Sequence, residues 1–397
     1  MIQPFSIGHL PRIEFGAGRI SLLPGIAAGF GQRLLLVTGG QSFLRSNAWP
    51  TLRQGLAEKR CDWEHLSIEG EPSPEMIDQA VAAWREKPID IVVGIGGGSV
   101  LDAAKAIAGL LMPANSVMDH LEGVGPELPY RGPATPFIAV PTTAGTGSEA
   151  TKNAVLTRHG AEGFKKSFRD ERLIANYAIV DPDLLASCPP GLIAANGMDA
   201  LTQLLEALVS TRSNPLTDAL ALSGIQAVME GLLPWYENDP VAAILGREKM
   251  AYAALLSGIC LAQTGLGSVH GLAQPLGSFF PIPHGVVCGT LLAAAVDVNV
   301  QVMQSRAPDH PALSKYAHVG RLFLQRAALD DIQALAGLVE VLKKWTVRLQ
   351  LPTLSTWGVT VSDFRHIVDH SRGSSMKTNP VVLNDEEIEQ ILRQRLD

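Results

Sequence analysis

Cysteine and charge are both scarce in this 397-residue sequence. Its four cysteines, at positions 61, 188, 260 and 288, are far apart and form no CxxC pair, which argues against a disulfide framework and indicates reduced thiols. Charged residues make up 18% of the chain, the formal net charge is −7, and lysine and arginine form no run. An acidic chain without a basic stripe is not typical of nucleic-acid-binding proteins, so we expect no nucleic-acid partner.

Long hydrophobic runs are also missing. The most apolar stretch, residues 285–296, is interrupted by Asp297 and is far shorter than the roughly 20 residues of a membrane-spanning helix, so we expect a core helix there. The opening residues, MIQPFSIGHLPRIEFG, contain no basic region followed by an apolar run, which argues against a secretory signal. These features predict a soluble, cytoplasmic protein without a membrane partner.

The composition that remains is that of a globular protein with two domains. Hydrophobic residues make up 46% of the chain, and 397 residues exceed the usual size of a single core. In the first half, short apolar runs end in loops rich in glycine or threonine, within residues 33–40, 89–111 and 136–149. Strands that alternate with helices predict an α/β domain with a parallel, Rossmann-like sheet covered on both faces.

After about residue 189 the pattern changes to long segments rich in alanine and leucine. Six of these predict helices, at residues 192–211, 216–235, 240–265, 286–302, 311–328 and 331–350. Asn, Pro and Gly separate the segments, which is typical of an all-helical domain. We therefore expect an α/β domain over residues 1–185 and an all-helical domain over residues 186–397.

Two loops of the first domain are candidates for binding a nucleotide. In GIGGGSVLDAAKA (residues 94–106), glycines end a buried strand and a helix begins near Ser99. Backbone N–H groups at such a junction can face a phosphate, because glycine has no Cβ to hold the phosphate away. In PTTAGTGSE (residues 141–149), hydroxyl groups follow another strand. Either loop alone could be an ordinary tight turn, but two on one sheet favour a dinucleotide.

The loop after the earlier strand bears on which dinucleotide binds. Enzymes that use NAD often place an acid here, where it binds the ribose hydroxyls. In this chain Gly39, Gly40 and Ser42 follow Thr38 without an acid, and Arg45 lies just beyond. We take these glycines and the serine as cofactor-binding candidates and expect NADP(H) rather than NAD(H), because the loop leaves room for a 2′-phosphate. An ordinary strand-end turn is the alternative.

The helical half contains candidate ligands for a divalent metal. In GMDALTQLLEALVS (residues 197–210), Asp199, Gln203 and Glu206 share one helix face, apart from the leucines. In SVHGLAQPLGSFFPIPHG (residues 268–285), we expect His270 on a helix and His284 in or after a loop. One aspartate and two histidines are a sufficient ligand set for Zn²⁺ or Fe²⁺ with a position left open for substrate.

Together these motifs resemble the iron-containing (group III) alcohol dehydrogenase family. The resemblance runs along almost the whole chain and rests on GGGSVLDAAKA, PTTAGTGSEAT, AIVDPDLL, GMDALTQLLEALVS, HGLAQPLGSFFPIPHG and NPVVLNDEEIEQIL. It implies an N-terminal dinucleotide-binding domain, a C-terminal helical domain for metal and substrate, a cleft between them for hydride transfer, and a homodimer. Glycerol dehydrogenase and dehydroquinate synthase share this architecture, but PTTAGTGSE and GMDALTQ favour the alcohol dehydrogenase branch.

The resemblance also assigns roles to single residues. The family's cofactor contacts fall on seven positions of the first domain: Gly97, Gly98, Ser99, Asp102, Thr142, Thr143 and Lys165. The family's metal is held by one Asp and three His; Asp199, His270 and His284 are present, whereas Gln203 replaces the remaining histidine. A further family histidine, close to substrate and nicotinamide, is Gln274 here. The resemblance therefore implies a catalytic site that contains His270, His284 and Gln274.

Two glutamines at histidine positions leave three interpretations open. In the first, Asp199, His270 and His284 hold Fe or Zn, and Gln203 is a weak ligand or is replaced by water. In the second, no metal binds, and the amides of Gln203 and Gln274 donate hydrogen bonds to the substrate carbonyl. In the third, the protein binds NADP without catalysis.

The function expected from the sequence is that of an NAD(P)-dependent alcohol dehydrogenase or aldehyde reductase. It would transfer hydride between nicotinamide and a small alcohol or carbonyl compound, with the help of a metal where one is bound. Near the C-terminus, Arg372 and Lys377 stand among serines. They could select an anionic substrate, or they could belong to a solvated loop.

Overall fold

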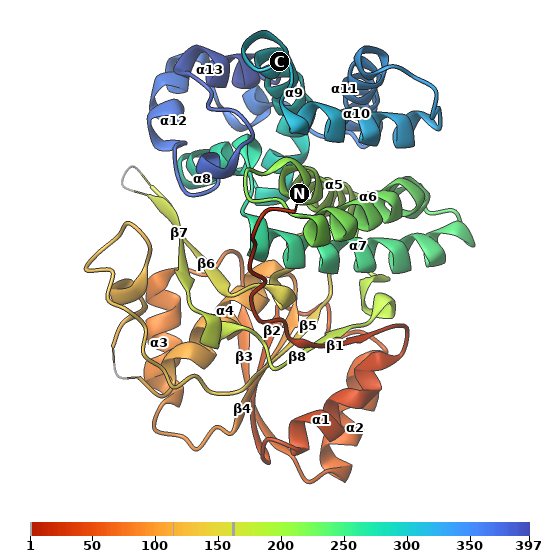
Figure 1. Ribbon diagram of the computed structural model, residues 1–397. Helices are drawn as coiled ribbons and strands as arrows, with labels where there is room; N and C mark the ends of the chain where they lie inside the picture. The colour runs from red at the N-terminus through yellow and green to blue at the C-terminus, as the bar shows by residue number, and fades with distance from the viewer. Residues whose placement is uncertain (1, 114, 161–162) are drawn as a thin grey trace. The chain divides into compact units, whose positions relative to one another are not determined.

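The protein is described by a computed structural model that covers residues 2–113, 115–160 and 163–397. The chain forms two compact units, one of Ile7–Cys188 and one of Pro189–Asp397 together with the segment before Ile7 (Figure 1). Compact units need not share their ends with functional domains, so the division into residues 1–185 and 186–397 stays a prediction.

A six-stranded parallel sheet forms the middle of the first unit. Its strand order is β1-β8-β5-β4-β2-β3, and every neighbouring pair is parallel. The strands are β1 (Arg12–Phe15), β2 (Arg33–Gly39), β3 (Asp62–Ile68), β4 (Ile91–Gly96), β5 (Phe137–Pro141) and β8 (Tyr177–Val180). The prediction of a parallel, Rossmann-like sheet is confirmed.

Helices cover both faces of this sheet, as β2 illustrates. Leu34 and Leu36 belong to a buried cluster that includes residues of α1 and α2, whereas Leu35 and Val37 belong to a cluster with α3 and α4. Figure 1 shows these two helix pairs on opposite sides of the strands. The covering helices are α1 (Leu23–Ala28), α2 (Ala48–Glu58), α3 (Pro74–Trp84) and α4 (Gly98–Leu110). Because successive side chains of a strand point to opposite faces, a strand covered on both sides is apolar throughout.

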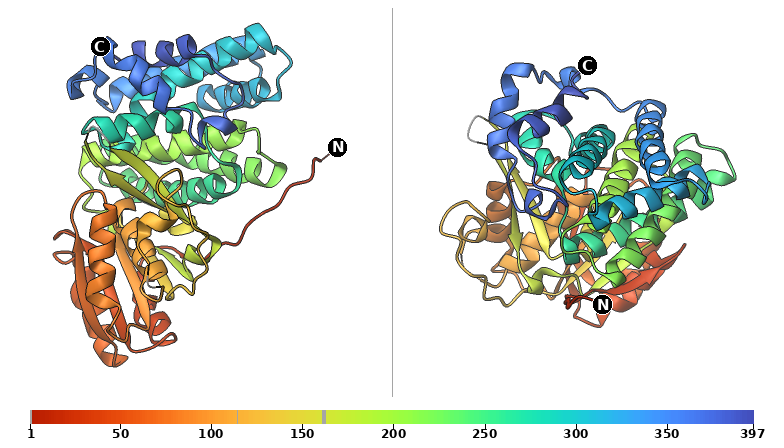
Figure 2. Two further views of the ribbon diagram at one scale, coloured as in Figure 1. Left: turned by 90° about the vertical axis from the view of Figure 1, so that its left-hand side faces the viewer. Right: turned by 45° about the horizontal axis from the view of Figure 1, so that its top comes forward.

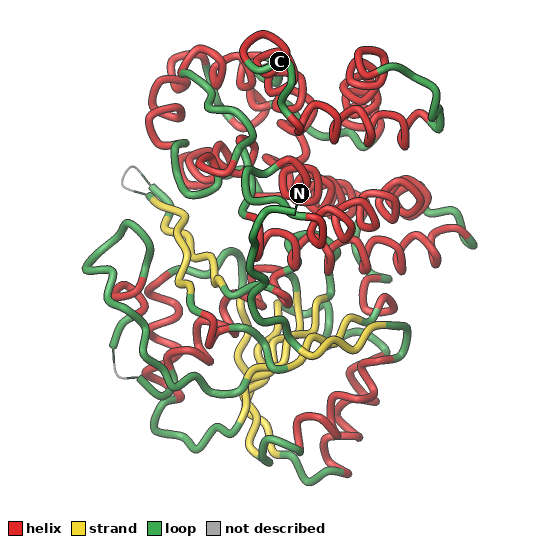
Figure 3. Tube along the Cα trace, in the orientation of Figure 1, coloured by secondary structure: helices red, strands yellow, loops and turns green. Residues whose placement is uncertain are grey.

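A second sheet of two antiparallel strands was not predicted. It consists of β6 (Asn153–Arg158) and β7 (Phe164–Arg169), and Figure 3 shows it in yellow, apart from the main sheet. Strand β6 packs against α4. Phe168 of β7 is completely buried and lies close to Gly109 of α4, so the hairpin adds apolar side chains to one face of the unit.

The regular elements that the structure describes after Pro189 are all helical, as Figures 2 and 3 show. The six predicted helices are present, with ends that differ by a few residues. The helices are α5 (Pro190–Val209), α6 (Pro215–Tyr236), α7 (Ala242–Thr264), α8 (Ser268–Phe279), α9 (His284–Arg306), α10 (Pro311–Leu324), α11 (Asp331–Arg348), α12 (Phe364–His370) and α13 (Asp385–Arg393). The prediction of an α/β domain followed by a helical one is therefore confirmed.

Helices α5 and α9 are largely buried in the second unit. By length and composition alone, α5, α6 and α9 could each cross a membrane, but the apolar stretches of α5 and α9 are 89% and 83% buried within the protein, against 44% for α6. The prediction of a core helix at residues 285–296 is thus confirmed. Because α5 packs against α6, α7 and α9, its polar side chains Asp199 and Gln203 are buried as well. Buried polar groups need partners, which directs attention to this helix.

Candidate metal centre and nucleotide loops

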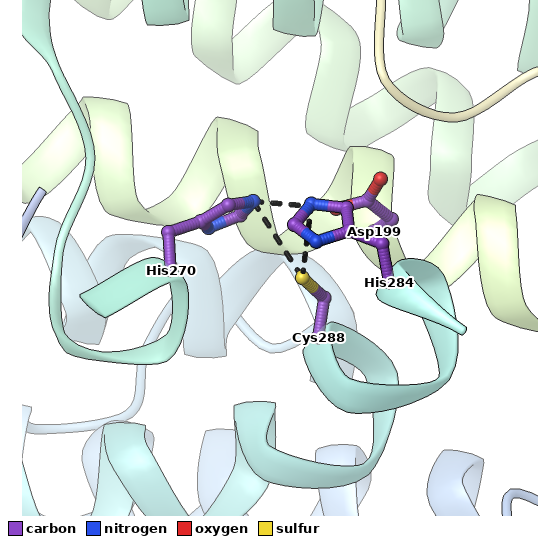
Figure 4. A group of neighbouring side chains, drawn as sticks. All are labelled: Asp199, His270, His284 and Cys288. Carbon is purple, nitrogen blue, oxygen red and sulfur yellow. Dashed lines mark hydrogen bonds and ion pairs between the residues drawn. The ribbon is translucent and has the colours of Figure 1, made fainter. Parts of the chain in front are cut away.

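Asp199, His270, His284 and Cys288 form a compact cluster in the helical unit (Figure 4). Asp199 lies on α5 and His270 on α8, while His284 is the first residue of α9 and Cys288 follows one turn later. Their ligand atoms all lie within 4.8 Å of one another. Asp199 and Cys288 are completely buried and His270 is 9% exposed, whereas His284 is partly exposed. The structure thus brings together the three ligands predicted from the sequence and adds a thiol.

The carboxylate of Asp199 faces both imidazoles. Asp199 Oδ1 lies 3.3 Å from His270 Nε2 and 3.9 Å from His284 Nε2. Both carboxylate oxygens are buried, and neither has a hydrogen-bond partner within residues 2–113, 115–160 and 163–397. A buried carboxylate that accepts no hydrogen bond is unfavourable unless a cation compensates its charge. The cluster therefore fits a divalent metal in its charge and in its donor atoms.

Cys288 was not predicted as a site residue, because the four cysteines were expected only to be reduced thiols. Its Sγ lies 3.6 Å from His270 Nε2 and 3.7 Å from His284 Nε2. The signal that could have found it is the spacing in HGVVC, because residues four apart on a helix share one face. This spacing indicates a second ligand only when the helix is known to face Asp199.

Glu206, two turns after Asp199 on α5, holds His270 in place. His270 Nδ1 donates to Glu206 Oε2 at 2.7 Å, and the backbone N–H of Val269 donates to Glu206 Oε1 at 2.7 Å. Gly267 leaves room for this carboxylate, because a Cβ there would lie 2.9 Å from Glu206 Oε1. In the neutral imidazole that donates its Nδ1 proton to Glu206, the lone pair of Nε2 faces the cluster. Glu206 was predicted to lie on this helix face, but without a role.

Burial and neighbouring charges shift the pKa values of the cluster. Burial acts to raise the pKa of Asp199, but His284 and His270 together bring it below its usual value. Burial acts to lower the pKa of His270, but Cys288, Glu206 and Asp199 raise it well above its usual value. Burial raises the pKa of the Cys288 thiol to about 12, although His270 opposes this effect. A metal has to displace the protons that these groups hold.

Both glutamines at family histidine positions lie on the faces that carry the site. Gln203 follows Asp199 by one turn, is 2% exposed, and its Oε1 finds no hydrogen-bond partner in the described part of the chain. Gln274 follows His270 by one turn on α8 and is half-buried. Its side chain lies close to Gly373, where an added Cβ would be 2.8 Å from Gln274 Oε1. The catalytic role of Gln274 and the ligand role of Gln203 stay predictions.

Arg372 is bound by protein groups of the same unit. Its guanidinium donates to the carbonyl oxygen of Leu383 at 3.0 Å and to Asp385 Oδ1 at 2.5 Å, while Lys377 is exposed. The carboxylate of Asp385, which also accepts from Arg365 Nη1 at 3.1 Å, pairs with the guanidinium of Arg372. The guanidinium therefore joins this loop to the start of α13, which disfavours the idea that it selects an anionic substrate.

In the α/β unit, predicted cofactor residues gather at the carboxyl ends of three adjacent strands. Gly39 ends β2, Gly97 follows β4, and Thr142 follows β5, and these strands lie in the order β5-β4-β2. The N–H of Thr142 donates to the carbonyl oxygen of Gly96 at 2.9 Å, which joins two of the loops. The chain runs outward from β2 to β3 and then returns to β4 on the other side of β2. Ligands of open α/β sheets bind at such a reversal of strand order.

The glycines after β4 fit close packing as well as anion binding. A Cβ at Gly98 would lie 2.7 Å from Thr146 Oγ1, and one at Gly97 would lie 3.3 Å from Thr143. Helix α4 begins at Gly98, with Ser99 second, and in the described structure no side chain caps its N-terminus and no acid lies in its first turn. The helix start is therefore suited to an anionic phosphate.

Asp102 and Lys165 are held by other protein groups. Asp102 Oδ1 accepts from Ser148 Oγ at 2.5 Å, and Oδ2 accepts from the backbone N–H of Val155 at 3.1 Å. Lys165 Nζ donates to Glu71 Oε1 at 2.6 Å. The carboxylate of Asp102 thus ties α4 to the segments that follow β5. The predicted contacts of Asp102, Lys165 and the other loop residues with a cofactor stay predictions.

Known proteins share both halves of this architecture. Residues 11–182 match the family described as iron-containing alcohol dehydrogenase, and residues 193–396 match its C-terminal domain. The NADPH-dependent butanol dehydrogenase of Clostridium saccharobutylicum is 30% identical and covers 96% of both chains, and the NAD-dependent methanol dehydrogenase of Bacillus methanolicus is 30% identical over 82% of both. A crystal structure of a 1,3-propanediol oxidoreductase superposes with a TM-score of 0.89 at 27% identity, over 99% of this chain and 100% of that one. The chain belongs to the iron-containing alcohol dehydrogenase family, whose members are oxidoreductases that act on the CH–OH group.

Proposed function

We propose that this protein interconverts a small alcohol and the corresponding aldehyde or ketone, with NAD(P)(H) as hydride carrier and a divalent metal at the Asp199 cluster. One observation carries the proposal: the buried Asp199 carboxylate accepts no hydrogen bond from any described residue, although two imidazoles face it. The position of the reaction in a cleft between the domains stays a prediction of the resemblance.

When bound, the metal supplies a Lewis acid for the substrate oxygen, and the nicotinamide supplies or accepts the hydride. Asp199 contributes negative charge, His270 contributes an imidazole oriented by Glu206, and His284 contributes a partly exposed imidazole on the side open to solvent. The burial of Asp199 and His270 keeps water away from these two ligands. Gln274 can hydrogen-bond a substrate but cannot act as an acid or base at neutral pH.

NADP(H) is the hydride carrier that the residues favour. Gly39 ends β2, Gly40 and Ser42 follow it, and no acid stands among them to repel a 2′-phosphate, while Arg45 is exposed nearby. The relatives do not decide the matter, since one is named NADPH-dependent and another NAD-dependent. Steady-state kinetics with both cofactors test the proposal: we expect a higher kcat/KM with NADPH, and a shift toward NADH in Gly39→Asp.

A homodimer in the cytoplasm is also proposed. The resemblance supports the dimer, and the four free cysteines support the location, because reduced thiols are usual there. Light scattering of the purified protein measures the mass in solution. A monomer at working concentrations would refute the dimer.

The experiment that tests the proposed function combines metal analysis with activity. The protein is purified without chelator, its metal content is measured by mass spectrometry, and NADPH oxidation is followed with a panel of aldehydes before and after EDTA. We expect near-stoichiometric metal and activity that is lost to EDTA and restored by metal. Activity without metal would favour a reductase that uses the amides of Gln203 and Gln274, and NADP binding without activity would favour a non-catalytic protein.

A further inference from the structure

Cys288 lies beside the three candidate ligands, and the resemblance assigned it no role. We propose that Cys288 binds the metal through its thiolate, as the fourth protein ligand beside Asp199, His270 and His284, and that this set favours Zn²⁺ over Fe²⁺. The inference rests on the proposed function for the presence of a metal. Cys288 would take over the ligand role of the family histidine that is Gln203 in this chain.

Three distances among the donor atoms are close to those around one tetrahedral ion, and all the ligand atoms lie within 4.8 Å of one another. With Zn–N of about 2.0–2.1 Å, Zn–S of about 2.3 Å and Zn–O of about 2.0–2.2 Å, tetrahedral angles place N and S about 3.5–3.6 Å apart and N and O about 3.3–3.5 Å apart. Cys288 Sγ lies 3.6 and 3.7 Å from the two Nε2 atoms, and Asp199 Oδ1 lies 3.3 Å from His270 Nε2. The separation of 3.9 Å between His284 Nε2 and Asp199 Oδ1 is the wider one.

The backbone around Cys288 allows α9 to approach α5 closely. A Cβ at Gly285 would lie 2.9 Å from the backbone of Ala195, and a Cβ at Gly289 would lie 2.9 Å from Met198 Cβ. These two glycines flank Cys288 on the face of α9 that meets α5. Cys288 is therefore held against Asp199 by helix packing and not by a mobile loop.

A ligand set with a thiolate also changes the chemistry of the centre. Thiolate is a softer ligand than imidazole or an amide oxygen, and a set that contains it suits zinc better than high-spin ferrous iron. With the carboxylate and the thiolate both ionised, a divalent ion gives a neutral centre, whereas one carboxylate and three imidazoles leave a single positive charge. Gln203 is then not required as a ligand, and substrate has to enter as an additional ligand, as in five-coordinate zinc sites.

Cys260 provides a matched control. It is completely buried in the same helical unit, but its thiol donates to the backbone oxygen of Thr217 at 3.7 Å, and it belongs to no cluster of metal-binding side chains among the described residues. Cys260→Ala and Cys288→Ala each remove one buried sulfur. A difference between the two variants in metal binding therefore reports ligation and not the loss of buried volume.

The test uses the full-length protein stripped with chelator and reloaded with Zn²⁺ or Co²⁺. We expect zinc-edge X-ray absorption of wild type and Cys260→Ala to contain one sulfur at about 2.3 Å, and both cobalt forms to show a sulfur-to-cobalt charge-transfer band. Cys288→Ala and Cys288→Ser should lose both signatures. In Cys288→Ala the Kd for Zn²⁺ should rise more than the roughly 10–100-fold that loss of an outer-sphere partner causes. Thermal melts of the stripped proteins check that the variants fold.

Two results would overturn the inference in different ways. Stoichiometric zinc bound by nitrogen and oxygen alone, with the same affinity in Cys288→Ala, would remove Cys288 from the ligand set and leave the metal-dependent function standing. Failure of folded wild type to bind either ion would remove the metal itself, and with it both this inference and the metal in the proposed function.

Discussion

Replacing Glu206 by glutamine is expected to weaken metal binding strongly, although Glu206 is not itself one of the proposed ligands. Glu206 accepts two hydrogen bonds, from His270 Nδ1 and from the backbone N–H of Val269, both at 2.7 Å. Glutamine offers one acceptor and one donor group. If its oxygen keeps the bond from Val269, its NH₂ group faces Nδ1, which must then lose its proton. The neutral imidazole would carry the proton on Nε2, where it blocks the lone pair needed by a metal.

The expected size follows from the role of such carboxylates behind metal-bound histidines. Loss of the partner typically costs 10–100-fold in metal affinity, which corresponds to about 1.4–2.7 kcal/mol. Competition with a chromophoric chelator measures the Kd for Zn²⁺ in wild type, in Glu206→Gln and in a control, Glu230→Gln. Glu230 pairs with Lys249 near the surface of α6, away from the cluster. ¹⁵N NMR of the imidazole of His270 reports the tautomer directly.

One combination of results would show that Glu206 does not orient His270. If Glu206→Gln binds Zn²⁺ as tightly as Glu230→Gln, and the proton of His270 remains on Nδ1, then the carboxylate does not set the tautomer. A folded Glu206→Gln with weaker binding and the Nε2–H tautomer is the expected result.

Three further predictions concern other parts of the molecule. Gly98→Ala places a Cβ 2.7 Å from Thr146 Oγ1 at the start of α4, so NADPH binding measured by fluorescence should weaken while the thermal melt stays cooperative; unchanged binding would contradict a phosphate at this turn. Burial raises the pKa of Glu149 from 4.5 to about 7, so the folded state holds its proton more tightly than the unfolded state, and the free energy of unfolding should fall as pH rises from about 4.5 to about 7; denaturant titrations of Glu149→Gln should lack that part of the slope, and identical slopes would refute it. Gln274→His introduces a group that titrates near pH 6.5, so the profile of kcat/KM against pH should gain a limb there that wild type lacks; matching profiles would place residue 274 outside proton transfer.

The main elements of the fold could be predicted because their local signals agree with their burial. Strands such as β4 are apolar throughout and end in glycine, since both faces of the sheet are covered, and the long helices are bounded by Pro, Asn and Gly. The hairpin of β6 and β7 could not be predicted in this way. The segment FKKSFR is mostly polar, and only its packing against α4 explains why Phe168 is buried.

The candidate site also contains residues that the sequence predicts and residues that only the packing of helices identifies. Asp199, His270 and His284 could be predicted as ligands because the family motifs contain them. Glu206 lies in the same motif as Asp199 but was given no role there, Cys288 lies outside the motifs, and the roles of both depend on which helices meet. From the sequence alone, Glu206 could be an ordinary polar residue on a helix face and Cys288 an ordinary buried thiol. Their roles become visible only because α8 and α9 both lie beside α5 in the structure.

The exchange of ligands between two helices explains how this chain could lose a histidine and keep a metal. On α5 the turn after Asp199 offers only the amide of Gln203, which is a poor ligand for zinc or iron. On α9 the turn after His284 offers Cys288, whose sulfur already lies within 3.7 Å of both imidazoles. Restoring the imidazole by Gln203→His in the Cys288→Ala background should therefore recover zinc binding without a sulfur ligand. Failure of that double variant to bind zinc, with a cooperative melt, would mean that position 203 cannot reach the ion and that Cys288 cannot be replaced.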